Sequence, residues 1–338
     1  MIISRLRWRS NTMKIRSICL FIGIILQASV AIAGSPESVG SKIENFGLNP
    51  GYLGMYLYAP ENMPENAPLV LSLHGSNMTA AGQAEITHWA KLADVWKFYV
   101  VHVEALEGAC NYDNPMLTTC FNSFDSNHYK RGMGEAASII DMVNYVKNNY
   151  SIDNRKVYIT GFSSGGLMSM AMIAAYPEVF ASAGIISGGP FFGDKGEPSF
   201  FARTSADDWK ARFKESNPEY NGEYPPVLMF NGGMDMMLPR SYAKNLLTQL
   251  KAIHGIDGDA NTTEKEGWTK TISSYNKNGK TVIKHYYIRN VGHAIPVDPG
   301  TGEDQGGSIP SDFMNRMLAK DADLYLPYHM AKFWGLDK

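Results

Sequence analysis

The sequence is poor in cysteine, carries little net charge and contains no long apolar run. Three of its 338 residues are cysteine, and 31 basic residues stand against 33 acidic ones. A near-neutral chain without a basic cluster suits neither nucleic acid nor an anionic membrane, so we expect neither as a partner. The apolar run at Ile18–Leu26 is shorter than the roughly 20 residues that a membrane-spanning helix needs.

The N-terminus nevertheless has the pattern of an export signal. Five basic residues precede the apolar run, and Ala31-Ile32-Ala33 follows it as a small-residue cleavage site. Translation from Met13 would still give a complete signal. We therefore predict that residues 1–33 are a cleaved signal peptide and that the mature protein is secreted or periplasmic. Its removal leaves 26 basic residues against 33 acidic ones, a formal net charge of about −7.

The cysteine content also fits an exported protein. Cys19 leaves with the predicted signal, so Cys110 and Cys120 remain in the mature chain. An even pair in an oxidising compartment predicts a disulfide between them. Two cysteines without paired histidines nearby do not favour a zinc site.

Short apolar strand patterns alternate with helical patterns along the mature chain. The strand patterns lie at 52–58, 69–73, 98–103, 157–160, 183–187, 227–230 and 282–289, and the helix patterns at 80–96, 134–150, 167–175, 207–214, 241–254 and 322–334. Alternation of this kind predicts an α/β fold, with a mainly parallel sheet and helices on both faces. No internal repeat and no linker composition is present, which indicates one domain over residues 34–338.

Three further expectations concern the arrangement of these segments. A cluster of turn residues separates 52–58 from 69–73, which predicts that these two strands are neighbours. Residues 255–280 are rich in turn residues and are expected to lack regular structure. Residues 104–130 form a long irregular loop that contains both cysteines, and we expect it to form one wall of a substrate cleft, as long loops in compact domains are usually functional.

The sequence Gly161-Phe162-Ser163-Ser164-Gly165 is a G-x-S-x-G motif between a strand and a helix. A serine at the tip of such a sharp turn needs small residues on either side, because the strand and helix backbones nearly touch there. The turn exposes the serine hydroxyl, and the start of the helix offers backbone N–H groups to a developing oxyanion. Ser163 is therefore the candidate nucleophile.

Two polar residues follow later strands and complete a set with Ser163. Asp235 comes after the strand at 227–230, and His293 comes after the strand at 282–289. A serine hydroxyl needs a base to take its proton, and a histidine base needs a carboxylate to hold its tautomer. The order Ser163, Asp235, His293 is the one found in α/β-hydrolases, so we predict that fold and this triad.

Other polar residues are candidates for the same roles. His74 follows the strand at 69–73 but precedes the serine, and it suits better a place beside the loop at 74–77, which could supply a second oxyanion donor. His102 lies within a strand and is expected to be a satisfied core residue. Asp298, Glu303 and Asp304 are acidic neighbours of His293 and are interpreted as a solvated loop. Residues 257–259 lack the full calcium-loop pattern, and the sequons at 77–79 and 261–263 are interpreted as coincidence.

With these residues assembled, the chain resembles the family of polyhydroxybutyrate depolymerase-like esterases and the feruloyl and acetylxylan esterases related to them. The resemblance runs from about Tyr52 to Leu336. It is carried by Leu73-His74-Gly75, Leu92-Ala93-Asp94, Cys120-Phe121-Asn122, Arg131-Gly132-Met133-Gly134-Glu135, the serine motif at 161–166, Gly292-His293-Ala294-Ile295-Pro296 and Phe333-Trp334-Gly335-Leu336.

The resemblance implies roles for particular residues. It implies Ser163 as nucleophile, His293 as base and Asp235 as the residue that orients the base. It also implies an oxyanion hole formed by the backbone N–H groups of Ser76 and Ser164. Ser76 stands where the family often has cysteine, and Phe121 stands where it often has tryptophan.

The sequence therefore predicts an exported serine esterase without a cofactor, which hydrolyses short-chain hydroxyalkanoate esters, oligomers or amorphous polymer through an acyl-enzyme. Two alternatives remain open. One keeps the mechanism but takes feruloyl or acetyl esters of plant polysaccharide as substrate. The other is an inactive binding protein that retains the fold.

Overall fold

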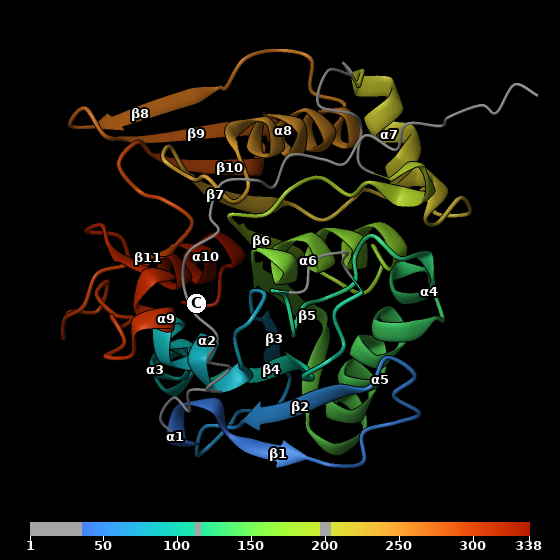
Figure 1. Ribbon diagram of the computed structural model, residues 1–338, viewed down its shortest axis with the longest axis vertical. Helices are drawn as coiled ribbons and strands as arrows, with labels where there is room; N and C mark the ends of the chain where they lie inside the picture. Colours follow the sequence, from blue (N-terminus) through green and yellow to red (C-terminus); the bar gives the residue numbers. More distant parts are fainter. Residues whose placement is uncertain (1–35, 112–115, 197–203) are drawn as a thin grey trace, which may run out of the picture. The chain divides into compact units, whose positions relative to one another are not determined.

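A ten-stranded sheet organises the part of the chain that this computed structural model describes, residues 36–111, 116–196 and 204–338 (Figure 1). Its strand order is β1-β2-β4-β3-β5-β6-β7-β10-β9-β8. The strands are β1 (Ser41–Ile43), β2 (Leu53–Tyr58), β3 (Ala67–Leu73), β4 (Tyr99–Ala105), β5 (Ile152–Phe162), β6 (Ser182–Ile186), β7 (Val227–Gly232), β8 (Thr262–Glu266), β9 (Lys270–Lys277) and β10 (Lys280–Ile288). The predicted signal peptide at 1–33 lies outside the described residues.

The centre of this sheet is parallel and its two edges are antiparallel. Strands β4, β3, β5, β6, β7 and β10 run in one direction, and each pairs with its neighbour in parallel register. The antiparallel strands are β1 and β2 at one edge and β9 and β8 at the other. A short second sheet pairs β11 (Ile295–Val297) with β12 (Ala319–Asp321). The predicted mainly parallel α/β architecture is confirmed.

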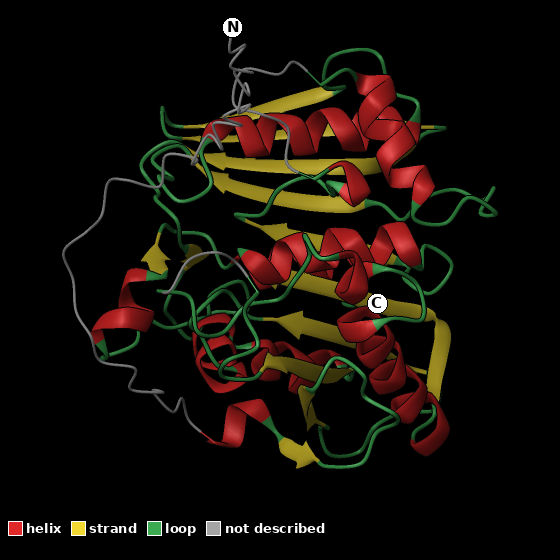
Figure 2. Cartoon of the chain, turned by 45° about the vertical axis from the view of Figure 1, so that its right-hand side comes forward, coloured by secondary structure: helices red, strands yellow, loops and turns green. Residues whose placement is uncertain are grey.

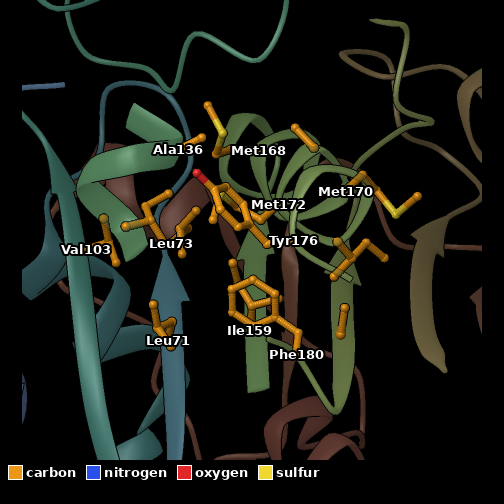
Figure 3. Packing of buried hydrophobic residues seen from close by; sticks show 14 of the residues in the cluster. Leu71, Leu73, Val103, Ala136, Ile159, Met168, Met170, Met172, Tyr176 and Phe180 are labelled. Carbon is orange, nitrogen blue, oxygen red and sulfur yellow. The ribbon is translucent and has the colours of Figure 1, made fainter. Parts of the chain in front are cut away.

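Successive residues of the central strands enter two different cores. In β3, Leu69 and Leu71 belong to one apolar cluster, while Val70 belongs to the other. This alternation follows from the two-residue period of a strand, and both sets are apolar because both faces of a parallel sheet are covered. Figure 3 shows part of the first cluster, which includes Leu71 and Ile159 of the sheet together with Met172.

Helices cover both faces of the sheet (Figure 2). Helices α5, α6 and α8 contribute buried side chains to the cluster that contains Leu71, and α2, α3 and α10 contribute to the cluster that contains Val70. The helices are α1 (Pro36–Val39), α2 (Ala80–Thr87), α3 (Trp89–Trp96), α4 (Ser126–Tyr129), α5 (Gly134–Asn149), α6 (Ser164–Ala175), α7 (Ala206–Glu215), α8 (Arg240–His254), α9 (Phe313–Met317) and α10 (Leu326–Trp334), with a 3-10 turn at Gly193–Lys195. Among the described residues, no helix combines the length and apolar character needed to cross a membrane.

The sheet corrects two of the expectations. Strands β2 and β3 are not neighbours, because β4 lies between them and pairs with both. Residues 255–280 are not irregular, since β8 and β9 lie within them and extend the sheet beyond β10. Every residue of β8 is exposed, so this strand lacks the apolar alternation by which strands are recognised in a sequence.

Two helices also differ from their predicted form. The helix expected at 80–96 is divided into α2 and α3 at His88, which adopts a left-handed conformation with φ of 47°. The last helix begins at Leu326 rather than at 322, and Pro327 occupies its first turn, where a missing N–H is tolerated.

Candidate active site

The turn between β5 and α6 holds Ser163 in a strained conformation. Strand β5 ends at Phe162, α6 begins at Ser164, and Ser163 between them has φ of 54° and ψ of −117°. A Cβ atom on Gly161 would overlap the carbonyl group of Gly165, and one on Gly165 would lie 2.5 Å from the carbonyl oxygens of Leu73 and His74. The close backbone approach expected from the G-x-S-x-G spacing is present.

Relief of this strain gives a testable prediction about stability. A non-glycine residue in such a conformation costs about 1–3 kcal/mol, whereas glycine adopts it freely at an entropic cost of about 0.5–1 kcal/mol. We expect Ser163→Gly to exceed Ser163→Ala in free energy of unfolding by about 1 kcal/mol, as measured by urea denaturation. Both variants lack the hydroxyl, so the comparison isolates the Cβ atom. A less stable glycine variant would show that the turn is not strained.

The structure brings Ser163, His293 and Asp235 together from three parallel strands. Ser163 follows β5, Asp235 follows β7 and His293 follows β10. His293 Nε2 lies 2.9 Å from Ser163 Oγ, and His293 Nδ1 lies 2.8 Å from Asp235 Oδ2. Because a carboxylate only accepts hydrogen bonds, Nδ1 carries the proton and Nε2 accepts from the serine hydroxyl. The arrangement can therefore remove a proton from Ser163.

Asp235 is held by its own loop as well as by His293. Its Oδ1 accepts hydrogen bonds from the backbone N–H groups of Met237 at 2.9 Å and Leu238 at 2.8 Å. The side chain of Asp235 is 2% exposed and that of His293 is 10% exposed. The two carboxylate oxygens thus have separate partners, and the carboxylate cannot turn without losing some of them.

Gly232, at the end of β7 before Asp235, allows two loops of the site to approach each other closely. In the structure a Cβ atom on Gly232 would overlap the carbonyl oxygen of Val291. Met234 N–H also donates to that oxygen at 2.9 Å. The loops that carry Asp235 and His293 are therefore in direct contact, and glycine is needed for their close approach.

Two backbone N–H groups of the loops around Ser163 have no hydrogen-bond acceptor within the described part of the chain. Those of Ser76 and Ser164 donate no hydrogen bond to another described residue. Ser164 is the first residue of α6, where N–H groups have no intrahelical acceptor and the helix dipole favours negative charge. These groups are available to an anion.

His74 supports the loop that contains Ser76. Its Nε2 accepts a hydrogen bond from Ala105 N–H at 2.9 Å, so its Nδ1 carries the proton and donates to the carbonyl oxygen of Gly75 at 2.7 Å. His74 is fully buried, and this burial lowers the pKa of its imidazole. His74 is therefore a neutral residue that holds the loop containing Ser76, the loop beside which the sequence places it.

The remaining candidates have other surroundings. His102 is buried, but neither ring nitrogen has a hydrogen-bond partner among the described residues, so the prediction of a satisfied core histidine is wrong in that respect. Burial lowers the pKa of His102 to about 3. Asp298 accepts a hydrogen bond from Gln305 at 3.4 Å and pairs by its backbone with Gly306, whereas Asp235 contacts His293.

Cys110 and Cys120 form the predicted disulfide, with the two sulfur atoms 2.08 Å apart. Closing so short a loop should stabilise the protein by about 2–3 kcal/mol in the chain-entropy model. We expect Cys110→Ser/Cys120→Ser to lower the free energy of unfolding by that amount, measured by urea denaturation. The unchanged protein under a reducing agent should match the double variant. Equal stability of all three samples would contradict the prediction.

The segment 116–120 lies against the loop that carries Ser76. Asn77 N–H donates to the carbonyl oxygen of Thr119 at 2.9 Å, and Thr119 Oγ1 donates to that of Met78 at 3.4 Å. The expectation that residues 104–130 form a wall of the substrate cleft stays a prediction. The sequence did not reveal the contact between residues 116–120 and the loop that carries Ser76. Asn77 was a usable signal, because an asparagine in a turn often adopts a left-handed conformation.

The fold and family of this chain define an esterase of the α/β-hydrolase class. The chain belongs to the family described as Esterase PHB depolymerase, which matches residues 53–271. Poly(3-hydroxyalkanoate) depolymerase C of Paucimonas lemoignei is 34% identical over 330 residues, covering 95% of this chain and 76% of that protein. The protein is accordingly a carboxylic-ester hydrolase.

Fungal esterases are more distant relatives. Feruloyl esterase B of Talaromyces funiculosus is 28% identical over 76% of this chain and 74% of its own length. Acetylxylan esterase A of Aspergillus ficuum is also 28% identical, over 76% of this chain and 85% of its own length. The solved acetyl xylan esterase from Aspergillus awamori has the same fold, with a TM-score of 0.65 at 24% identity over 75% of this chain and 93% of that one.

Proposed function

We propose that the protein is an exported serine esterase that hydrolyses short-chain hydroxyalkanoate esters through Ser163, His293 and Asp235. The observation that carries the proposal is the continuous hydrogen-bonded chain from Ser163 Oγ through His293 to Asp235, together with the backbone N–H groups of Ser76 and Ser164, which have no partner among the described residues. The predicted signal at 1–33 and the disulfide support export, because disulfides persist in oxidising compartments.

Each group has a role in the two half-reactions. Ser163 Oγ attacks the ester carbonyl carbon while His293 Nε2 takes its proton, and the N–H groups of Ser76 and Ser164 bind the resulting oxyanion. The bond to the leaving alcohol breaks as His293 returns the proton to that oxygen. Water then attacks the acyl carbon and gives its proton to His293, which passes it to Ser163 Oγ as the bond between Oγ and the acyl carbon breaks and the acid leaves. Asp235 stabilises the imidazolium formed in each half-reaction.

The surface beside Asp235 supports a polyester substrate. Met234, Met236 and Met237 flank Asp235 in sequence and are 63%, 83% and 59% exposed. Exposed methionines offer flexible apolar contacts and are frequent on surfaces that bind varied apolar partners. Aliphatic acyl and polyester chains suit such a surface better than a sugar backbone does. The depolymerase relative, with 34% identity and 95% coverage of this chain, supports the same class.

The second candidate substrate is a feruloyl or acetyl ester of a plant polysaccharide. It is supported by the fungal feruloyl and acetylxylan esterases, each 28% identical to this chain. Their chemistry would use the same triad and differ in the alcohol that leaves. An inactive binding protein has less support, since the three triad side chains are in hydrogen-bond contact.

A substrate panel tests this proposal directly. The mature protein, residues 34–338, would be assayed on p-nitrophenyl acetate, butyrate and octanoate, on 3-hydroxybutyrate oligomers, and on feruloylated and acetylated xylo-oligosaccharides. We expect the highest kcat/KM among the natural esters for the hydroxybutyrate oligomers, and labelling of Ser163 by a reactive phosphonate. A preference for the xylo-oligosaccharides would favour the second candidate. Absence of turnover and of labelling would favour the binding protein.

A further inference from the structure

Asn77 directly follows Ser76 and attaches the turn that contains it to another segment of the chain. Asn77 adopts a left-handed conformation with φ of 58°, which asparagine tolerates better than most residues. On the other side of Ser76, the carbonyl oxygen of Gly75 accepts hydrogen bonds from His74 Nδ1–H and Met78 N–H. Ser76 is thus held between two anchored neighbours, although its own N–H has no described partner.

Asn77 makes its hydrogen bonds to a single segment, residues 116–119. Its backbone N–H donates to Thr119 O at 2.9 Å, and its Nδ2 donates to Met116 O at 2.8 Å. Its Oδ1 accepts from Thr118 N–H at 2.9 Å. An asparagine side chain supplies both a donor and an acceptor here, and both are used by backbone groups. Alanine and glycine can make neither contact.

That segment is itself held near its C-terminal end. The disulfide joins Cys120, directly after the segment, to Cys110, and Gly108 N–H donates to Thr118 O at 2.8 Å. Beyond the disulfide, Asn122 makes two hydrogen bonds to the buried carboxylate of Glu135, at 2.8 Å through its N–H and at 2.7 Å through Nδ2. The segment can therefore serve as a rigid support for Asn77.

We propose that Asn77 is a positioning residue for the oxyanion hole, which fixes the Ser76 N–H by joining its turn to the disulfide-closed segment 116–119. The inference rests on the proposed function. An oxyanion donor acts only if it is held within a few tenths of an ångström of the place where negative charge develops, and the supporting contacts decide this. Asn77 touches no reacting atom and acts through the adjacent residue.

Three substitutions of Asn77 separate its side-chain contacts from its backbone conformation. Asn77→Gly keeps the left-handed conformation accessible but removes both side-chain hydrogen bonds. Asn77→Asp keeps the acceptor for Thr118 N–H and loses the donor to Met116 O. Asn77→Ala removes the contacts and also strains the backbone. Asn278→Ala is the matched control, because Asn278 has φ of 51° in the turn between β9 and β10, at the opposite end of β10 from His293.

The test measures kcat and KM on p-nitrophenyl butyrate. Each variant is assayed at a temperature well below the midpoint of its thermal unfolding. We expect kcat to fall about 10- to 100-fold in Asn77→Gly, less than the roughly 10²–10³-fold loss on removal of a whole oxyanion donor. KM should change less than about threefold, and Asn77→Asp should be intermediate. A trifluoromethyl ketone, which forms a tetrahedral adduct with Ser163, should lose affinity in proportion to kcat/KM. Asn278→Ala should keep the kcat of the unchanged protein.

A double-mutant cycle with Cys110→Ser/Cys120→Ser adds a second readout. If Asn77 acts through the disulfide-closed segment, the two changes should not be independent. The fold-loss in kcat of the variant that combines Asn77→Gly with Cys110→Ser/Cys120→Ser should then be smaller than the product of the two separate fold-losses. Full kcat in Asn77→Gly, or an equal loss in Asn278→Ala, would overturn the inference while leaving the proposed function intact. An unchanged protein without esterase activity and without Ser163 labelling would instead overturn the proposed function.

Discussion

Ser163→Ala should lower kcat on p-nitrophenyl butyrate by about 10⁵- to 10⁶-fold and leave the protein folded. Loss of a triad nucleophile removes the covalent route entirely, and the residual rate reflects only bound water and the oxyanion donors. The fold should persist because alanine keeps the Cβ atom and the backbone conformation of Ser163. Rates would be measured with purified protein, and folding would be checked by circular dichroism and urea denaturation.

The matched control for this prediction is Ser41→Ala. Ser41 is an exposed residue of β1 at the edge of the sheet, so the same chemical change there should leave kcat unaltered. A Ser163→Ala protein that retains more than about a tenth of the activity would exclude Ser163 as the nucleophile. The hydrogen bond between Ser163 and His293 would then have to serve a structural purpose.

Asp235→Asn should lower kcat by about 10⁴-fold, because the surrounding hydrogen bonds force the amide into a harmful orientation. Met237 N–H and Leu238 N–H both donate to Oδ1, so the amide oxygen of asparagine would take that position. The NH₂ group would then face His293 Nδ1 and donate to it. The imidazole would have to carry its proton on Nε2, where it cannot accept the proton of Ser163.

Asp298→Asn is the matched control for Asp235→Asn. Asp298 is an acidic residue that follows β11, close to His293 in sequence, but its carboxylate contacts Gln305 rather than the imidazole. We expect its kcat to stay within about twofold of the unchanged protein. If Asp298→Asn is as inactive as Asp235→Asn, or if Asp235→Asn is fully active, Asp235 is not the residue that orients the base.

Apolar periodicity predicted the centre of the fold better than its edges. Strands β3, β5, β6 and β7 are almost wholly buried in their paired regions and are visible as short apolar runs. Strand β8 has the sequence TTEKE and is exposed throughout, so it has no burial pattern to detect. It forms because β9 provides backbone partners along its length. The pairing of β2 with β4 instead of β3 was also missed. It depends on the path of the chain between the strands, which the residue pattern of a strand does not contain.

In the candidate site, too, features set by local sequence could be predicted and features set by contacts between distant loops could not. Local chemistry identified Ser163, since the glycines on either side are required by the turn itself. Strand ends and chain order then indicated Asp235 and His293. The donors to Asp235 Oδ1, the tautomer of His74 and the contacts of Asn77 were missed, because each depends on how one loop lies against another. Asn77 and Thr118 are 41 residues apart, and no periodicity relates them.

By itself, the sequence determined an α/β chain with a sharp serine turn, candidate side chains for a triad and a pair of cysteines suited to a disulfide. These features depend on local backbone geometry, on residue type and on the order of strands, which a linear pattern retains. Only the tertiary structure decided which backbone N–H groups hold the Asp235 carboxylate, and that Asn77 joins the loop containing Ser76 to residues 116–119. Such contacts depend on the paths of irregular loops, where hydrogen bonds of about 3 Å select one partner among chemically equivalent candidates.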